Sequence, residues 1–212
     1  ISDHAMKLIK FLFFLFLLFA YNYFFCMPRA LNVNKDGLKN ATKRDSLERA
    51  VKKSDIDTSR VKLLNDLGTE LIKIGKYKNA VQYLQEANSL AKKLGYKSGM
   101  AKSYNKLGNA FWFQGDYEST LKRWLSAIKI WEEIGDKKGM SNEYSNVGLI
   151  YSSQKNFVKA FEYYAKGLRT AESIPDTKTM AHAYNNIGAT YMRQSLAAPT
   201  DAESKSYLWL SL

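Results

Sequence analysis

Cysteine is almost absent from the chain. A single cysteine, Cys26, occurs among 212 residues, so an internal disulfide and a cysteine-ligated metal site are both excluded. Histidine is nearly as scarce, because His4 and His182 are the only two, and a lone histidine on a helix is more often solvated than a ligand or a base. Phosphate-binding glycine loops and nucleophile motifs are also missing. The sequence therefore predicts a protein that is not an enzyme and that binds no metal or cofactor.

Proline is equally rare, and acidic residues are outnumbered by basic ones. With 3 prolines, 46% hydrophobic and 25% charged residues, the composition is that of a folded protein. The net charge is +12, but the lysine pairs are scattered and alternate with Asp and Glu. A nucleic-acid footprint requires basic residues gathered on one face. We therefore expect a solvated, lysine-rich surface and disfavour nucleic acid as the partner.

A long apolar run occurs only near the N-terminus. Lys7 and Lys10 introduce an apolar stretch from Phe11 to Ala20. A run of this length is typical of a signal peptide, since a membrane-spanning helix needs roughly 20 apolar residues. We predict that residues 1–30 form a signal peptide or, if it is not cleaved, a membrane anchor. Residues 31–41 are polar and are predicted to be a linker.

The chain after this segment repeats itself with a period of forty residues. The stretches SYNKLGNAF, EYSNVGLIY and AYNNIGATY fall at equal intervals, and Gly68, Gly108, Gly148 and Gly188 coincide when the chain is aligned on that period. Such a period indicates stacked structural units, each too small to bury its own apolar face. We divide the chain into units at 61–100, 101–140 and 141–180, with an incomplete fourth unit at 181–212. A further helix is expected at 42–60.

Each unit has the apolar spacing of two helices. In the second unit this spacing is interrupted at Gly115 and Asp116, which suit a left-handed helix end and the cap of the next helix. The pair Gly135 and Asp136 repeats the same pattern between units. Glycine inside a helix costs about 1 kcal/mol relative to alanine. Its recurrence in mid-helix, as at Gly108, therefore predicts a close approach between the two helices of a unit.

These positions resemble the tetratricopeptide repeat (TPR) family. The residues that carry the resemblance are, in the second unit, Tyr104, Leu107, Gly108, Phe111, Thr120, Trp124 and Ala127, and, in the third, Tyr144, Val147, Gly148, Tyr151, Ala160, Tyr164 and Gly167. The first unit departs from the pattern at Leu64 and Leu71. The common family unit has 34 residues and ends at a proline, whereas these units are longer and carry Lys92, Glu132 and Glu172 at the proline position.

The longer units look like a forty-residue subclass found in animal polarity scaffolds and in the exported sensory regions of bacterial histidine kinases and nucleotide cyclases. The resemblance implies an all-α fold, a right-handed α-solenoid of antiparallel helix pairs. It also implies a protein–protein interaction scaffold at the cell envelope, either exported to the bacterial periplasm or anchored in the membrane through the N-terminal segment. The alternative is the sensory fragment of a transmembrane kinase or cyclase whose catalytic domain lies outside this chain.

The last residues of the chain, YLWLSL, match part of a second helix. The fourth unit is therefore expected to stop inside that helix and to leave an apolar edge through which the chain could associate with itself.

The resemblance also implies where a partner binds. TPR units line a concave groove with their first helices, and the corresponding residues here are Lys62, Asn65, Thr69, Lys73, Lys102, Asn105, Asn109, Trp112, Phe113, Asn142, Ser145, His182, Asn185 and Arg193. We expect Asn65, Asn105, Ser145 and Asn185 to form a polar row along the groove. An amide offers both a donor and an acceptor to an extended peptide backbone. Trp112 and Phe113 are expected to add an apolar anchor.

Overall fold

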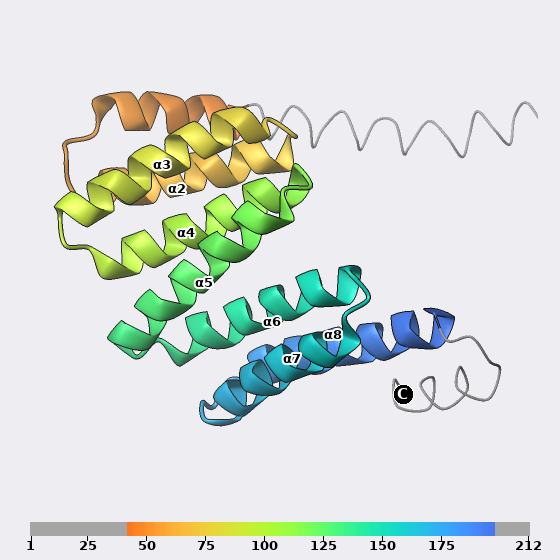
Figure 1. Cartoon of the computed structure of the whole chain (residues 1–212). Helices are drawn as coiled ribbons and strands as arrows, with labels where there is room; N and C mark the ends of the chain where they lie inside the picture. The colour runs from red at the N-terminus through yellow and green to blue at the C-terminus, as the bar shows by residue number, and fades with distance from the viewer. Residues whose placement is uncertain (1–41, 198–212) are drawn as a thin grey trace, which may run out of the picture. The chain divides into compact units, whose positions relative to one another are not determined.

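The computed structural model describes residues 42–197, and within them all regular structure is α-helical (Figure 1). The predicted leader at 1–30, the linker at 31–41 and residues 198–212 of the fourth unit lie outside the described residues. A first helix covers residues 42–53. The other helices are α2 (Thr58–Lys73), α3 (Tyr77–Lys93), α4 (Lys97–Phe113), α5 (Tyr117–Ile134), α6 (Lys137–Ser153), α7 (Phe157–Glu172) and α8 (Thr177–Ala197). The chain divides after Ser46, and the packing described below concerns the second part.

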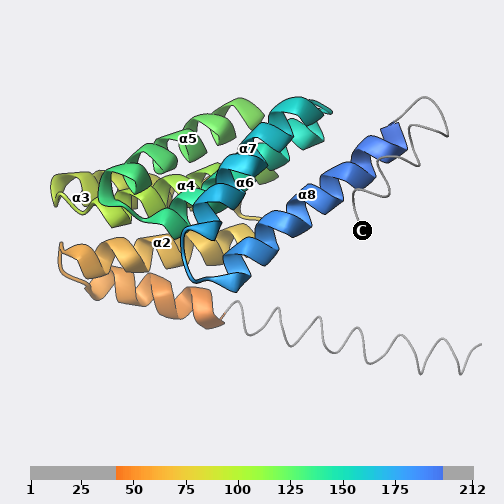
Figure 2. The same ribbon diagram turned by 90° about the horizontal axis from the view of Figure 1, so that it is seen from below.

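The helices form antiparallel pairs that follow the forty-residue period. α2 packs on α3, α4 on α5, and α6 on α7, while α8 is the first helix of the next unit. Successive pairs stack, because α3 also contacts α4, α5 contacts α6, and α7 contacts α8 (Figures 1 and 2). This arrangement confirms the predicted all-α solenoid of helix pairs. No helix in the range 42–197 is long and apolar enough to span a membrane.

The helix boundaries differ from the predicted unit boundaries in a regular way. Each first helix begins three or four residues before the unit assigned from the sequence, as Lys97 and Lys137 show. The single helix expected at 42–60 is wrong in its extent, since the helix ends at Lys53 and α2 begins at Thr58. Asp57 causes this break, because its side chain accepts hydrogen bonds from the backbone N–H groups of Ser59 and Arg60.

The mid-helix glycines make room for a large side chain from the second helix of the same unit. A Cβ atom added at Gly68 would lie 2.5 Å from the side chain of Leu84, and one added at Gly148 would lie 2.6 Å from the ring of Tyr164. At Gly108 the added atom would overlap the indole of Trp124. The predicted close approach is confirmed, and these second-helix residues lie one period apart just as the glycines do. The repeating glycine is therefore a packing requirement.

Four turns between helices contain a left-handed glycine, and at Gly115 and Gly135 the next residue is a capping aspartate. Gly115 and Gly135 have φ of 77° and 70°, as their places in the sequence predicted. Asp136 then caps α6 by accepting from the backbone N–H of Gly139 at 2.8 Å. The turn after α6 departs from this pattern, because Lys155 takes the left-handed conformation with φ of 60°. A side chain at that position adds strain that glycine would avoid.

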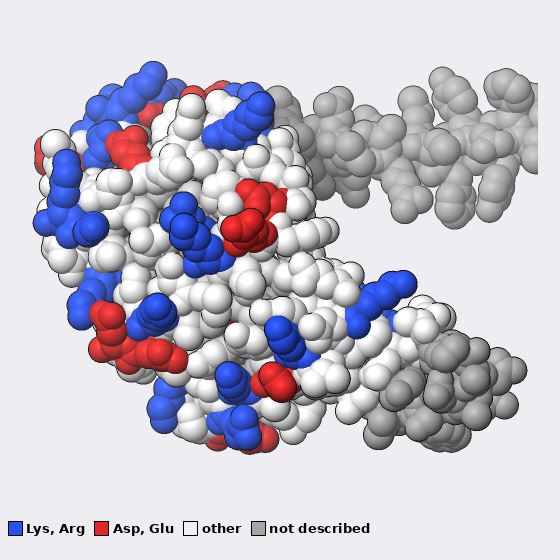
Figure 3. Space-filling view, in the orientation of Figure 1, with Lys and Arg blue, Asp and Glu red and all other residues white. Residues whose placement is uncertain are grey.

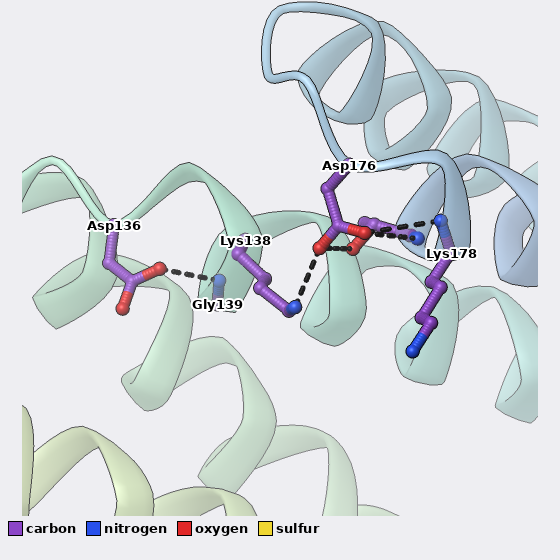
Figure 4. A network of polar contacts seen from close by, with 6 residues as sticks. Asp136, Lys138, Gly139, Asp176 and Lys178 are labelled. Carbon is purple, nitrogen blue, oxygen red and sulfur yellow. Dashed lines mark hydrogen bonds and ion pairs between the residues drawn. The ribbon is translucent and has the colours of Figure 1, made fainter.

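The third junction between units has both a cap and an ion pair. Asp176 accepts from the backbone N–H groups of Lys178 and Thr179 at the start of α8 (Figure 4). The same carboxylate accepts a hydrogen bond from Lys138 Nζ at 2.6 Å, which joins the start of α6 to the start of α8. These contacts hold the pKa of Asp176 at about 2. Asp136 thus only caps its helix, whereas Asp176 caps its helix and also links two units through Lys138.

Candidate binding face

The candidate site is the face formed by the first helices of the units. α2 packs directly on α4, and α6 packs on α8, while α5 packs on α6 and joins these two pairs of first helices. Helical periodicity places residues two, five, nine, twelve and thirteen of a unit on one side of its first helix. The candidate residues taken from the family resemblance occupy these positions. Their exposure decides which of them a partner could reach.

Two rows of side chains on this face are open to solvent. At the second position of each unit, Lys62, Lys102 and His182 are exposed and Asn142 is half-buried. At the thirteenth position, Lys73, Phe113, Ser153 and Arg193 are all exposed. Asn185 is exposed as well. Six of these exposed side chains have cationic or aromatic ends, which are well suited to contacts with a partner.

The expected polar row at the fifth position is not accessible, and this prediction was wrong for two of its four members. Asn65 is 4% exposed and donates a hydrogen bond from Nδ2 to the carbonyl of Val61 in its own helix. Ser145 is 1% exposed because it faces α7 at Gly167, where an added Cβ atom would lie 3.3 Å from its hydroxyl. In these two units the fifth position therefore turns toward the interior, where a partner cannot reach it.

Asn105 is half-buried, and its amide is used within the protein. Its Nδ2 donates to the carboxylate of Glu143 on α6, which also accepts from Asn146. Of the four residues predicted to form the row, only Asn185 on α8 is exposed. A peptide backbone lying on this face would consequently not find a ladder of free amides.

Each junction between first helices is bridged by a polar contact. Lys106 on α4 donates to the hydroxyl of Thr69 on α2. The bond from Asn105 to Glu143 links α4 to α6. Thr190 on α8 donates to Ser152 on α6 at 3.1 Å, and Arg193 Nη1 reaches the same hydroxyl at 3.3 Å. The first helices of four successive units are thus connected along this face by hydrogen bonds.

The bridging residues were not identified from the sequence. The residue types differ from one junction to the next, so they leave no periodic pattern. Glu143 could have been noticed, however, because the equivalent positions hold Leu63, Ser103 and Ala183. A carboxyl at a position that is otherwise apolar or small indicates a buried ionisable group.

Burial changes the acidity of two bridging groups. Glu143 is 2% exposed, and desolvation raises its pKa to about 7, although the hydrogen bonds from Asn146 and Asn105 act in the opposite direction. Burial is also the main reason why the pKa of Lys106 is lowered, with Lys102 and Lys73 adding repulsion and Asp66 opposing it. The α2–α4 part of the face therefore gathers several lysines around one half-buried ammonium.

The predicted apolar anchor is divided between two environments. Trp112 is half-buried and packs against Tyr117 and Trp124 of its own unit, with ring centroids 5.2 and 6.2 Å apart. Asn109 is half-buried too, and its side-chain oxygen accepts from the indole N–H of Trp124 at 3.2 Å. Phe113 is 56% exposed and stacks on Tyr77 at 5.7 Å. Of the two predicted anchors, only Phe113 presents a largely accessible ring.

Charge is distributed over the surface without one dominant patch. Figure 3 shows lysines and arginines across the visible face with acidic side chains between them. This is the scattered pattern expected from the sequence. Among residues 42–197, no group of three or more histidine, cysteine, aspartate or glutamate side chains is placed to hold a metal ion.

Comparisons with known proteins agree with this architecture. Two family models, both described as tetratricopeptide repeat, match residues 61–94 and 99–173. Proteins with these repeats are in general scaffolds that bind protein or peptide partners, and they are typically not enzymes. Among curated proteins, no sequence match was found.

Solved structures with the same fold share little sequence with this chain. BtubC from P. vanneervenii is 18% identical, with a TM-score of 0.62, over 82% of this chain and 70% of its own. A putative kinesin light chain with TPR-like repeats from Podosopora anserina is 13% identical, with a TM-score of 0.63, over 83% of this chain and 87% of its own. A STAND protein with a tetratricopeptide repeat sensor from Pyrococcus horikoshii is 18% identical, with a TM-score of 0.65, over 78% of this chain and 25% of its own. At these identities the likeness shows the fold alone.

Proposed function

Since the chain carries tetratricopeptide repeats, we propose that it is a protein-interaction scaffold that binds a peptide or protein segment along the first helices of its units. The observation that carries this proposal is the pair of exposed rows at the second and thirteenth positions, represented by Lys62, Lys102 and His182 on one side and Lys73 and Arg193 on the other. Residues repeated at one register form a row when the units stack, so a partner can contact several units at once.

The chemistry of the face favours side-chain contacts. Exposed cations of the two rows can pair with acidic groups of a partner, and Phe113 offers an aromatic surface. The half-buried bridges between α2, α4 and α6 hold the rows in register. We therefore assign binding to the exposed rows and assign Asn105 and Glu143 to the support beneath them.

The experiment compares two triple variants of the same chain. Replacing Lys62, Lys102 and His182 by alanine removes three members of one row. The matched control replaces Lys93, Lys122 and Gln82, which are exposed residues of the second helices, by alanine. A partner is first captured from a cell extract with the parent protein, identified, purified and then titrated against each variant.

The row variant should bind the purified partner one to two decades more weakly, because each lost contact contributes about 0.5–1.5 kcal/mol and 1.4 kcal/mol corresponds to one decade. The control should bind with the parental affinity. Equal weakening by both variants, or weakening by the control alone, would assign binding to another surface.

The cellular location is part of the proposal. Lys7, Lys10 and the apolar run that follows support export to the bacterial envelope or anchoring in a membrane. Residues 6–40 fused to a reporter that works only outside the cytoplasm should give activity. A silent reporter that is expressed normally would contradict export.

A sensory role is the second candidate. One fold neighbour, the STAND protein, is described as having a tetratricopeptide repeat sensor, and the present chain spans a quarter of that protein's length. Sequencing the gene beyond the codon for Leu212 tests this candidate, since a membrane span followed by a kinase or cyclase domain is expected. Self-association through the C-terminal edge is tested by measuring the mass of the protein in solution.

A further inference from the structure

Two clefts occur at equivalent places of the array, two repeat periods apart. The first, of about 360 Å³, lies between the turn at Gly75–Asn79 and Gln114. The second, of about 450 Å³, is lined by Lys155 and Phe157 of the equivalent turn and by Arg193 near the end of α8. Gly75 corresponds to Lys155, and Tyr77 corresponds to Phe157. Each of the two clefts is formed between the turn of one unit and the first helix of the next.

Both clefts combine an aromatic ring with cations. In the first, Tyr77 is flanked by the exposed Lys76 and Lys78, and the ring of Phe113 stacks on that of Tyr77 with an interplanar angle of 7°. In the second, Phe157 lies with Lys155 and Arg193. A ring beside an ammonium or guanidinium group suits a carboxylate side chain, because its methylene groups can lie on the ring while its oxygens meet the cation.

The lysines of the clefts are available for such a contact. The ion pairs found among residues 42–197 link Arg44, Arg60, Lys73, Lys97 and Lys138 to acidic side chains, and none of them uses Lys76, Lys78 or Lys155. All three lysines are exposed. A partner could pair with them without breaking a contact of the folded protein.

The turn between the two clefts has the opposite charge. Asp116 and Glu118 occupy the turn of the second unit, and both are exposed. A continuous polyphosphate such as single-stranded nucleic acid would be repelled there, because its charge does not vary along the chain. A protein segment can place acidic residues at the two clefts and a neutral or basic residue between them. The alternation of charge therefore favours a protein partner.

We propose that the edge of the array formed by the turns within units is a second interaction surface, which binds an acidic protein segment with carboxylates in the Lys76–Lys78 cleft and in the Lys155–Arg193 cleft. This surface shares Arg193 with the thirteenth-position row of the first helices, but Lys76 and Lys78 belong to neither row. The Lys76–Lys78 cleft can therefore be tested whether or not the first-helix assignment holds.

The probe is a fluorescein-labelled deca-glutamate peptide, titrated against the full chain at low ionic strength and followed by fluorescence anisotropy. Lys76→Glu with Lys78→Glu reverses the charge of the first cleft, and Arg193→Glu reverses a cation of the second. The matched control is Lys92→Glu with Lys93→Glu, which reverses two equally exposed lysines at the other end of α3. Far-UV circular dichroism and thermal midpoints establish that each variant is folded.

The variant with Lys76→Glu and Lys78→Glu should bind the peptide at least tenfold more weakly than the parent. The control with Lys92→Glu and Lys93→Glu should remain within about twofold to threefold of the parent, and so should the alanine variant of Lys62, Lys102 and His182. Glu118→Lys should strengthen binding, because it removes the opposing charge between the clefts. No measurable binding by the parent, or equal losses in the cleft and control variants, would overturn the proposal. A deca-thymidine probe that binds more tightly than the peptide and depends on the same lysines would also overturn it, in favour of nucleic acid.

Discussion

Gly108 shows how a single residue of the repeat determines the packing of its unit. The indole of Trp124 occupies the space that a side chain at Gly108 would need, and it donates to Asn109 from that position. Gly108→Leu should lower the free energy of unfolding by roughly 1–3 kcal/mol, the usual cost of overpacking. Urea denaturation measures this free energy of unfolding, and Lys122→Leu, on an exposed helical surface, is the control. Equal stability of Gly108→Leu and the parent would show that the indole moves aside freely.

Lys155 is a residue whose replacement should stabilise the protein. Its φ of 60° is unfavourable for a residue with a Cβ atom, and the equivalent turns have glycine. Lys155→Gly should raise the free energy of unfolding by about 1 kcal/mol. The control, Lys76→Gly, changes a position with φ of −85° and should not stabilise. A lower thermal midpoint for Lys155→Gly than for the parent would contradict this account.

Glu143 should make stability depend on pH. Its pKa is about 7 in the folded protein and near its usual value of 4.5 in the unfolded chain. Between these values the folded state binds more protons than the unfolded state, so the free energy of unfolding falls as pH rises. Glu143→Gln keeps one acceptor oxygen in place of the two that accept from Asn105 and Asn146, but it does not ionise. It should therefore be more stable than the parent at pH 8 by up to about 3 kcal/mol.

The difference between Glu143→Gln and the parent should shrink at pH 4.5, where the carboxyl is protonated in the folded state and half protonated in the unfolded chain. Urea denaturation at the two pH values measures this. If the variant and the parent have parallel pH profiles, Glu143 is not buried in the way described.

At the scale of the helices, the sequence predicted element types better than element contacts. Gly115 and Gly135 marked helix ends because positive φ strongly favours glycine, and Asp136 marked a cap because a carboxylate can accept backbone N–H groups. The break before α2 was missed, although Asp57 forms a cap of the same kind. No glycine precedes Asp57, so the pair of glycine and capping aspartate that marked the other helix boundaries is incomplete there.

The junction between α6 and α8 should respond to acid through Asp176. Its pKa of about 2 lies below the usual value of 3.8, so its contribution to stability is present above that value and is lost as pH falls toward 2. Asp176→Asn keeps the capping acceptor but loses the ion pair with Lys138, and it should lower the thermal midpoint at pH 7. The difference in thermal midpoint between Asp176→Asn and the parent should become smaller in high salt, which screens exposed ion pairs.

Asp136→Asn is the matched control for Asp176→Asn, since Asp136 caps α6 and makes no such pair. Its thermal midpoint should depend on salt no more than that of the parent. A salt-dependent loss of equal size in both variants would show that the effect comes from capping and not from the link between units.

At the scale of the whole molecule, the repeat period predicted the stacking, but exposure within each helix could not be predicted from it. Asn65, Asn105 and Asn185 share one register, yet the structure has them buried, half-buried and exposed. The neighbours differ from unit to unit, as Glu143 beside Asn105 illustrates. A partner would therefore use the exposed second and thirteenth positions. Of the amides that suggested a binding row, Asn65 bonds within its own helix, Asn105 links two units and only Asn185 is exposed.

Site-specific photocrosslinking tests the assignment of binding to the first helices most directly. The photoreactive residue p-benzoylphenylalanine is introduced singly at Lys62, Lys102 or His182 in the exposed row, and at Lys93, Lys122 or Lys129 on the second helices, and each protein is irradiated with the purified partner. The account predicts crosslinks to one continuous segment of the partner from the three row positions and none from the second helices. Crosslinks formed only from the second-helix positions would contradict it.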